Sequence, residues 1–431
     1  MSDLARSTAS LRVLLVTQYY PPETGAAPNR LSETAKQLAL AGYDVTVLTS
    51  LPNYPQGRIF EAYRGRWLVQ EELEGIRVIR TWAYVSEHRG FVHRLANYLS
   101  FAFLSVWAGI RHGGPQDAIV VEAPPLFLGI SGILLGWWMR APMIFNVSDL
   151  WPESAVSMGV LHNRILIRMA VALENYIYHH SYAITGQTQG IVDNIRSRLP
   201  GVPVELITNG VVPDRYVAAA DERDRVRSQF DFGERFVVGY TGLHGLAQGL
   251  QTLIEAADQL RDNSGILFVL MGDGPDKKSL EADVARRCLR NVRFYLTQPA
   301  ENMPAILSAM DAAIVPLKDL PLFRGALPSK LFECMAAGLP IVLSVCGEAR
   351  TLLEQANGGI CVPPEDALAM AEAVAKLAQN REMASSLGRN GASYVRIHYD
   401  RRQIGQRFAR LIPIPQRMVT SANTGHDTIS S

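Results

Sequence analysis

The feature that most limits how this chain can fold is a regular alternation of short apolar runs with helical stretches, which occurs twice. In the first half, strands are predicted at residues 11–17, 44–49, 76–81, 118–122, 142–147 and 182–186. A second series starts with residues 204–208 and continues at 236–240, 265–271, 291–296, 312–316 and 340–344. Apolar runs that alternate with helices are typical of buried parallel strands. The sequence therefore predicts an α/β protein with two doubly wound parallel sheets.

Helix and turn signals predict where the domains begin and end. Helices are predicted at residues 29–41, 248–261, 329–337 and 383–410. A turn at Asn209–Gly210, followed by the polar stretch 221–235, puts the boundary near residues 201–214. We expect a first domain at 1–200, a second at 201–395, and a return of residues 396–412 onto the first. Residues 413–431 lack apolar periodicity and are predicted to be disordered.

The composition excludes some classes of function. Hydrophobic residues make up 48% and charged residues 19% of the 431, as in an ordinary globular protein. Lys and Arg total 42 and Asp and Glu 41, so the net charge of +1 offers no global basic field for nucleic acid. The four cysteines stand singly, which argues against a zinc site or a disulfide framework. A reducing cytoplasm is the expected compartment.

Two stretches, 99–110 and 123–139, carry no charge and are strongly apolar. Both fall short of the roughly 20 residues that span a bilayer, and the run at 11–16 is too short for a signal peptide. One interpretation is a pair of helices buried over most of their surface. The other is partial contact with a membrane surface, since basic and aromatic residues accompany the first stretch. These residues are Arg89, Phe91, Arg94, Tyr98, Trp107 and Arg111.

Three glycine-containing loops follow predicted strands, where small residues let the backbone approach a ligand and a helix N-terminus favours an anion. The loop at 23–28 contains Gly25 and Ala26 but is not G-x-G-x-x-G, so it is no dinucleotide fingerprint. The loop at 239–249 has four glycines in eleven residues and includes His244. His244 is interpreted either as a ligand contact or as a solvated loop residue. The loop at 271–275 is interpreted as a tight turn.

The most specific block is residues 324–340, RGALPSKLFECMAAGLP. Pro328 and Ser329 are typical of a helix start, so Lys330 falls in the first turn, where a cation opposes the helix dipole. That unfavourable charge suggests a ligand anion nearby, with Arg324 as a helper; the alternative is that Lys330 points to water. Glu333 lies nearly one turn after Lys330 and could accept hydrogen bonds from ribose hydroxyls.

Polar residues also follow strands in the first half. Asp149 comes just after the strand at 142–147, at the end of such sheets where ligands bind, and is predicted to be catalytic or sugar-binding. The alternative is that it caps a short helix that starts at 150–152. Asn53 and Tyr54, in the turn at 53–57, are candidate acceptor contacts. Asp-x-Asp, Walker A, H-E-x-x-H and G-x-S-x-G are absent, which argues against metal-dependent, P-loop, zincin and α/β-hydrolase sites.

Taken in order, these segments resemble family 4 retaining glycosyltransferases of the GT-B fold, in the branch of bacterial capsule, colanic-acid and O-antigen assembly. The resemblance covers about residues 11–410 and rests on residues 18–57, 148–154 (SDLWPES), 207–211 (ITNGV), 242–250 (GLHGLAQGL) and 328–342 (PSKLFECMAAGLPIV). It implies two Rossmann-like domains that face a cleft, with a nucleotide-sugar donor held mainly by the second and the acceptor by the first.

The resemblance also assigns roles and exposes departures. Glu333 matches the second Glu of the family's E-x7-E element as the ribose contact, whereas the first Glu is Gly325 here. The family's Lys-Gly is Gln248–Gly249, and the Arg of its usual basic pair is missing, so Lys330 is the leading candidate for the diphosphate. Asp149 replaces the loop His of many members.

The expected reaction is retaining transfer from a UDP-sugar, with an N-acetylated 6-deoxy sugar suggested by the branch, to a lipid-linked saccharide. No cofactor, metal or enzyme nucleophile is expected, and the location is cytoplasmic or peripheral on the inner face of the plasma membrane. The alternatives are a nucleotide-sugar 2-epimerase, which forms product without acceptor, and a non-catalytic sugar-nucleotide-binding subunit. The predicted residues are Asp149 and Lys330 for catalysis; Gly25, Ala26, His244, Gln248, Arg324, Leu327, Pro328, Ser329 and Glu333 for the donor; and Asn53, Tyr54 and Arg30 for the acceptor.

Overall fold

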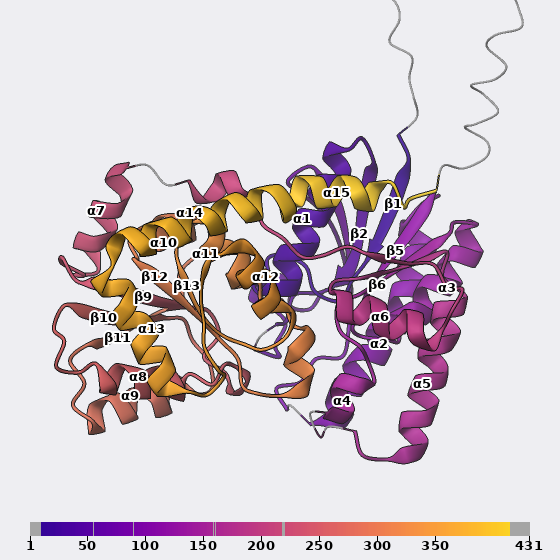
Figure 1. Cartoon of the computed structure of the whole chain (residues 1–431). Coiled ribbons are helices and arrows are strands. Elements are labelled where there is room, and N and C mark those ends of the chain that lie inside the picture. Colours follow the sequence, from indigo (N-terminus) through magenta and orange to yellow (C-terminus); the bar gives the residue numbers. More distant parts are fainter. Residues whose placement is uncertain are drawn as a thin grey trace, which may run out of the picture. The chain divides into compact units, whose positions relative to one another are not determined.

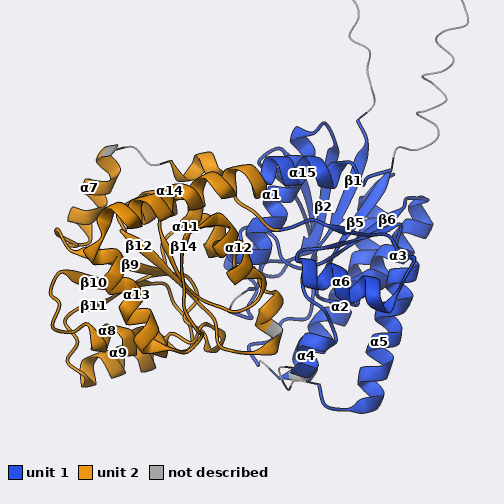
Figure 2. Cartoon of the chain, viewed as in Figure 1, with its two compact units in different colours: residues 1–208, 401–431 blue, residues 209–400 orange. Residues whose placement is uncertain are grey.

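The computed structural model describes residues 10–413 except 55, 89, 158, 160, 218 and 219. The chain divides into two compact units (Figure 2): unit 1 comprises residues 1–208 and 401–431, and unit 2 comprises residues 209–400. The predicted disordered tail falls almost wholly at 414–431, outside the described residues.

Unit 1 is built on an eight-stranded sheet with the order β3-β4-β2-β1-β5-β6-β7-β8. All neighbours are parallel except β3 and β4, which pair antiparallel. The strands are β1 (Arg12–Val16), β2 (Asp44–Ser50), β3 (Leu68–Leu73), β4 (Ile76–Thr81), β5 (Ala118–Ala123), β6 (Met143–Val147), β7 (Ala183–Gly186) and β8 (Val204–Leu206).

Helices cover both faces of this sheet (Figure 1). One face carries α2 (Phe91–His112), α3 (Leu128–Met139), α5 (Arg164–His179) and α6 (Gln189–Arg198), whose inner residues share a core with the strands. The other face carries α1 (Ala26–Leu40) and α15 (Arg401–Ala409) over a second core. The short elements are η1 (Glu61–Tyr63) and α4 (Glu153–Ser157).

The end of the described chain returns to unit 1 through α15, beside α1 (Figure 1). The Tyr43 hydroxyl donates to the Ala409 carbonyl at 3.0 Å, and Phe408 and Ile412 are buried in the core under α1. A Cβ on Gly405 would lie 2.5 Å from Cβ of Gln37, so a glycine is needed where the two helices meet.

Unit 2 is built on a six-stranded sheet, all parallel, with the order β11-β10-β9-β12-β13-β14. The strands are β9 (Phe236–Thr241), β10 (Ile266–Met271), β11 (Val292–Tyr295), β12 (Ala312–Pro316), β13 (Ile341–Ser344) and β14 (Gly359–Cys361). Fully buried residues in β9, β10, β12 and β13 form the middle of this unit.

Two helical layers enclose this second sheet (Figure 1). One core lies under α7 (Ala220–Gln229), α10 (Met303–Ser308), α11 (Ser329–Ala336), α12 (Glu348–Ala356) and α14 (Arg381–His398). The other lies under α8 (Gln251–Gln259), α9 (Lys277–Arg286) and α13 (Ala367–Gln379). The 3-10 turns are η2 (Pro213–Tyr216), η3 (Leu246–Gln248), η4 (Ala300–Asn302) and η5 (Pro321–Gly325).

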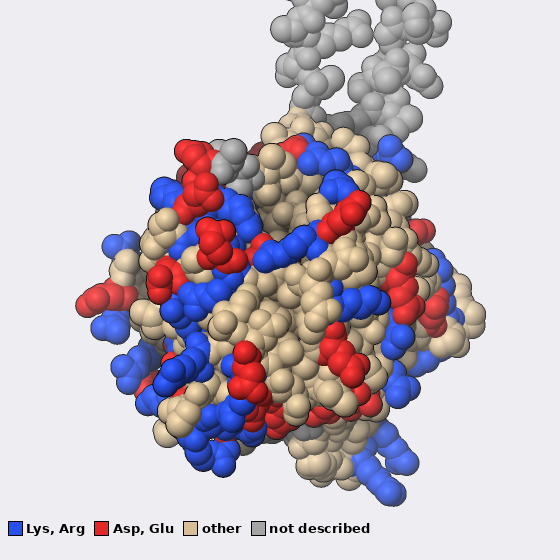
Figure 3. All heavy atoms as spheres, turned by 60° about the vertical axis from the view of Figure 1, so that its left-hand side comes forward, with Lys and Arg blue, Asp and Glu red and all other residues tan. Residues whose placement is uncertain are grey.

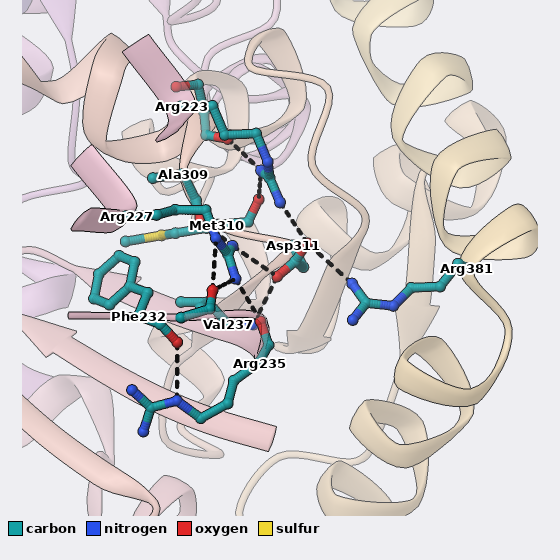
Figure 4. A network of polar contacts seen from close by, with 11 residues as sticks. Arg223, Arg227, Phe232, Arg235, Val237, Ala309, Met310, Asp311 and Arg381 are labelled. Carbon is teal, nitrogen blue, oxygen red and sulfur yellow. Dashed lines mark hydrogen bonds and ion pairs between the residues drawn. The ribbon is translucent and has the colours of Figure 1, made fainter. Parts of the chain in front are cut away.

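A polar network closes the amino end of this sheet (Figure 4). The Asp311 carboxylate, just before β12, accepts hydrogen bonds from the guanidinium groups of Arg223, Arg227 and Arg381 and from the amide of Val237. The arginines come from α7 and α14, so one buried carboxylate ties two helices to two strands. All of these partners are groups of unit 2 itself, so we interpret the network as structural.

The structure corrects several predicted elements. Residues 204–206 form β8 at the edge of the first sheet, so they do not start the second series, and unit 1 extends to residue 208. Strands β3 and β14 were not predicted. The single helix predicted at 383–410 is two helices, because the chain breaks at Tyr399 and Asp400, where the amide of Val211 donates to the Tyr399 carbonyl at 3.0 Å.

Each sheet has a switch point beside its first strand, from which the connections run to opposite sides. β1 lies between β2 and β5, and β9 lies between β10 and β12, so the connections on either side run in opposite directions. Ligands of open α/β sheets bind at the carboxyl ends of the strands at this point. The loops after β1 and β9 are therefore where the fold itself positions binding residues.

Candidate functional site

In unit 2, the glycine-rich loop after β9 is fixed on two sides. The amide of Gly242 donates to the Met271 carbonyl at 2.9 Å, and the amide of Lys318 donates to the Ala247 carbonyl at 3.0 Å. Gly272 permits the first contact, since a Cβ there would lie 1.9 Å from the Gly242 oxygen. The tight turn at 271–275 thus braces the loop after β9.

His244 lies inside this loop and is 0% exposed, so its interpretation as a solvated residue is wrong. Its amide donates to the Asp273 carbonyl at 2.9 Å, but neither ring nitrogen has a hydrogen-bond partner among the described residues. Burial, helped by Lys277 and Lys330, lowers the pKa of His244 to about 4. The ring is therefore neutral near pH 7, with one donor and one acceptor unused.

Lys330 reaches from the first turn of α11 to the same loop. Its Nζ lies 3.7 Å from the centroid of the Tyr240 ring, and a Cβ on Gly242 would be 3.0 Å from it. The residue as a whole is half-buried, but the ammonium group is packed among protein atoms, and this desolvation lowers its pKa to about 7. The interpretation that Lys330 points to water is therefore wrong.

The start of α11 has the features of a helix end that can bind an anion. Pro328 occupies the N-cap position without a side-chain cap, and the first turn contains no acidic residue. The side chain of Asn209 donates to the Ser329 hydroxyl at 3.1 Å and accepts from the Gly210 amide at 2.9 Å. The sequence analysis uses Asn209 as a turn signal and as part of ITNGV but gives it no site role, whereas the structure shows it bonded to a predicted donor residue. Amides at such a helix start favour negatively charged ligand groups.

The remaining predicted donor residues of unit 2 differ in burial and in their contacts. Gln248 ends η3, and its side-chain oxygen is buried without a partner among the described residues. Arg324 is exposed. Its backbone packs closely against Gly347, where a Cβ would lie 1.9 Å from the Arg324 carbonyl oxygen. Leu327 packs against the core below α11. Glu333 is half-buried and close enough to Lys330 to favour its charged form.

In unit 1, the loop after β1 is joined to the loop after β2 by Glu23, which is 1% exposed. Its carboxylate accepts hydrogen bonds from the amides of Tyr20 at 3.1 Å, Asn53 at 2.8 Å and Tyr54 at 2.8 Å. Burial raises the pKa of Glu23, and these three amides oppose the rise. Glu23 lay inside the predicted loop at 23–28, but its role was missed because only three-dimensional structure shows which amides it meets.

The predicted donor and acceptor residues of these loops lie together. Gly25 precedes α1, Ala26 starts it, and a Cβ on Gly25 would be 3.5 Å from the Tyr54 ring. Tyr54 is partly exposed and its ring centroid is 5.4 Å from that of Tyr19. The side-chain amide of Asn53 instead points inward and donates to the Leu51 backbone carbonyl at 2.9 Å. The predicted Tyr54 is thus paired with Tyr19, which the sequence analysis does not single out.

Arg30 is bound within the protein. Its guanidinium contacts both carboxylate oxygens of Glu122, at 2.6 and 3.2 Å. Glu122 also accepts from Asn146 and, at 2.7 Å, from the Ser148 hydroxyl, and Thr185 donates to Asn146 at 2.6 Å. The network follows the register of β5, β6 and β7 at their carboxyl ends. Glu122 therefore holds the Arg30 side chain that was predicted to contact acceptor.

Asp149 lies two residues beyond β6 and is half-buried. Burial raises its pKa, while the Leu150 amide and the Ser154 hydroxyl oppose the rise. The helix that follows, α4, begins only at Glu153, so Asp149 does not stand at its N-cap and the capping interpretation is wrong. Among the described residues it forms no ion pair.

Two further observations concern the described residues only. They contain no group of three or more His, Cys, Asp and Glu side chains placed to hold a metal ion. No helix among them combines the length and the apolar character that crossing a membrane requires.

Two doubly wound units, each with a binding loop where its sheet changes direction, define the GT-B class of fold. Residues 25–210 match the glycosyl transferase 4-like domain and residues 222–394 match the glycosyl transferases group 1 domain. The solved structures of sucrose-phosphate synthase from Thermosynechococcus elongatus and of HepE from Anabaena with UDP-glucose share the fold. Their TM-scores are 0.72 and 0.70, at 18% and 17% identity, with 96% and 95% of this chain and 100% of each of theirs covered.

Curated relatives agree with the domain matches. The chain is 28% identical over 379 residues to the putative colanic acid biosynthesis glycosyl transferase WcaI of Escherichia coli K12, covering 84% of this chain and 90% of that protein. It is 27% identical over 256 residues to the alpha-D-kanosaminyltransferase of Streptomyces kanamyceticus, covering 58% and 64%. The chain belongs to the family 4 glycosyltransferases of the GT-B fold, as its sequence predicted. It is therefore an enzyme that transfers a sugar.

Proposed function

We propose that this glycosyltransferase moves a sugar, with retention of anomeric configuration, from a UDP-sugar to a lipid-linked saccharide in cell-surface polysaccharide biosynthesis. The resemblance to WcaI, whose name refers to colanic acid, supports the polysaccharide role. Structures of HepE with UDP and UDP-glucose support a uridine nucleotide as the donor. The reaction takes place in the cytoplasm or at the inner face of the membrane, where such acceptors are anchored.

The observation that carries the proposal is the Lys330 ammonium, held between the Tyr240 ring and the loop at Gly242 with no carboxylate bonded to it among the described residues. The chemical demand is the departure of a nucleoside diphosphate from a sugar that develops positive charge. Fixed donors aimed at the departing charge lower this barrier. Lys330 and the amides at the start of α11 supply them on the donor side.

On the acceptor side, Asp149 would orient the acceptor hydroxyl or stabilise positive charge on the sugar ring. The burial that raises its pKa also reduces screening by water, so that a carboxylate there acts more strongly at short range. Tyr19 and Tyr54 offer ring faces on which a saccharide can stack, and Glu23 fixes the loops that carry them. A front-face route requires no enzyme nucleophile, and none is assigned.

The test is a donor screen with the full chain, membrane lipid extract and mass detection of products. The proposal expects a lipid-linked product one sugar heavier with at least one UDP-sugar, and about ten- to a hundredfold less of it with Lys330→Ala at the same enzyme concentration. Incubation without lipid distinguishes an epimerase, because it would convert donor to its epimer there. Product formed only from a non-uridine donor, or only on a water-soluble acceptor, would contradict the proposal.

A further inference from the structure

Three of the helices that cover one face of the unit 1 sheet, α2, α3 and α5, expose many apolar side chains. α3 lies between α2 and α5: a Cβ on Gly109 would be 2.6 Å from Leu135, and a Cβ on Gly129 would be 2.6 Å from Ile177. All three helices bury their inner residues in the same core. Their outward sides therefore lie on the same side of the sheet, and we call this side the α2–α3–α5 face.

The α2–α3–α5 face is apolar where a surface layer is normally polar. Phe103 on α2 is 76% exposed and Trp137 on α3 is 79% exposed. The exposed apolar residues of the face are Leu99, Phe103, Trp107, Ile110, Ile130, Leu134, Trp137, Trp138, Ile165, Leu166, Met169 and Tyr176. Single exposed apolar residues need no explanation, but a set of this size on adjacent helices marks an interaction surface.

The helices themselves explain why this surface is not ordinary. α3 contains a single polar side chain, Ser131, which is buried and donates to the Ala102 carbonyl at 2.8 Å. A helix that packs on a core with one side carries polar residues on the other. α3 is apolar all round, so its outer side needs another apolar environment. Most residues of the two stretches are buried or half-buried, as one interpretation expected, but each stretch also exposes four apolar side chains.

The charges around the face have one sign. Exposed arginines accompany all three helices, and none forms an ion pair with another described residue; they are Arg94, Arg111, Arg140, Arg164 and Arg168. The one acidic residue in the three helices, Glu174, is buried and bonded to Arg198 at 2.7 Å. By contrast, the surface in Figure 3 shows basic and acidic side chains interspersed.

We propose that the α2–α3–α5 face docks on an anionic lipid bilayer, with its aromatic and aliphatic side chains in the interface and its arginines at the phosphate headgroups. Aromatic residues and arginines are the groups that anchor proteins at this depth. The inference rests on the proposed function for its purpose, delivery of a lipid-linked acceptor. The test of docking is independent of the proposed function, since docking requires neither donor nor turnover.

Charge also decides between a bilayer and a second copy of the chain. A symmetric dimer through this face would bring the same patch of each copy together, and with it arginines of like charge. Like charges across an interface are unfavourable, whereas an anionic leaflet attracts each arginine. The bilayer is therefore the occupant that fits both the apolar and the charged residues.

The experiment is flotation of the full chain with vesicles of phosphatidylethanolamine and phosphatidylglycerol, and with vesicles of phosphatidylcholine alone. One variant, Phe103→Ser with Trp137→Ser, removes apolar anchors, and another, Arg164→Gln with Arg168→Gln, removes charge. The matched controls are Leu40→Ser on α1 and Arg407→Gln on α15, both exposed residues on the opposite face of the sheet. Light scattering of each protein reports its oligomeric state, and UDP affinity reports an intact unit 2.

Docking predicts binding to the anionic vesicles that weakens with salt and is much weaker on phosphatidylcholine. The arginine variant should bind about 25-fold less tightly, from about fivefold for each arginine near an anionic surface. The apolar variant should bind at least about tenfold less tightly, and the controls like the original chain. Equal binding by all variants, no vesicle binding at all, or a dimer that the apolar variant converts to monomer would overturn the proposal. Activity on an acceptor enters none of these outcomes, so failure of the proposed function would be seen separately.

Discussion

At the carboxyl end of the unit 1 sheet the charges of Glu23, Arg30 and Glu122 are hydrogen-bonded within the protein, whereas at the carboxyl end of the unit 2 sheet the Lys330 ammonium is bonded to no carboxylate of the described residues. Arg30 holds both oxygens of Glu122, and Glu23 accepts three backbone amides. Among the described residues no carboxylate is bonded to the Lys330 ammonium, which lies against the Tyr240 ring and the loop at Gly242 with Glu333 nearby. Paired charges fix loops in place, while an unpaired, poorly hydrated cation gains most from an incoming anion. The difference supports the proposals that the unit 1 network is a scaffold and that Lys330 binds the diphosphate.

The largest expected effect is on stability, from Glu122→Ala in unit 1. This change leaves the Arg30 guanidinium buried without its carboxylate, which costs about 3–5 kcal/mol of unfolding free energy. Urea unfolding measures the loss, and the doubly changed Arg30→Met, Glu122→Leu protein should regain much of it. UDP affinity of the folded protein should not change, and a large loss of UDP affinity would remove the distinction between the two units.

Lys330→Ala should show the opposite pattern. Loss of a charged contact to the diphosphate is worth about 1.5–3 kcal/mol, so UDP-sugar affinity or turnover should fall by about ten- to a hundredfold. Stability should be unchanged or higher, because a poorly hydrated ammonium is removed. Calorimetry of UDP binding and urea unfolding give the two readouts, with the exposed Lys278→Ala on α9 as the matched control. Unaltered affinity and turnover would retire the assignment.

Asp149→Asn separates chemistry from structure in unit 1. A carboxylate that acts on the sugar or acceptor loses its charge in this variant, and turnover should fall by at least roughly tenfold while the fold survives. Steady-state kinetics with circular dichroism check both statements. A folded variant with the original turnover would leave Asp149 as an ordinary loop residue and confine the chemistry to other groups.

Glu333→Gln is expected to have the smallest effect. One hydrogen bond to a ribose hydroxyl contributes about 0.5–1.5 kcal/mol, so affinity should fall a few-fold for UDP and UDP-sugar alike. Competition experiments give the affinities of UDP and of diphosphate without uridine. Only the affinity of UDP should fall if Glu333 contacts the ribose. If UDP affinity holds while selectivity among sugars shifts, Glu333 contacts the sugar and not the ribose.

The sequence predicted the parts of the fold that depend on apolar periodicity. The core strands of both sheets and the start of α11 fall within a few residues of the prediction, because buried parallel strands carry long apolar runs. β3 was missed because it is an edge strand with three polar residues in LVQEEL, and β14 because it has only three residues. The break at Tyr399 and Asp400 has no local sequence signal, since it follows from a pairing with Val211.

The site was predictable to a different degree in each unit. Pro328, Ser329 and Lys330 are consecutive, so a helix-start signal alone brings them together. Glu23 and Glu122 act through partners about 30 and 92 residues away, and no local pattern indicates such pairs. For α3 the sequence left a buried helix and contact with a membrane surface both open, because an apolar helix looks the same in sequence in either setting.

The pH dependence of donor binding follows from the lowered pKa of Lys330, which is about 7 in the free protein. A bound diphosphate favours the charged form and raises this pKa. Donor affinity should therefore be complete below about pH 7 and decline as the pH rises above it, by up to tenfold for each pH unit. UDP-glucose is a suitable probe because its diphosphate does not titrate between pH 6 and 9, and Lys330→Ala should abolish the decline.

The measurement that tests the account most directly is the pKa of Lys330 itself, with and without UDP. The chain has only six lysines, so carbon-13 labelled lysine side chains can be followed by NMR and Lys330 assigned from Lys330→Arg. The account predicts a pKa of about 7 in the free protein and a rise when UDP binds. A Lys330 pKa at the ordinary 10.5 that UDP leaves unmoved would contradict it.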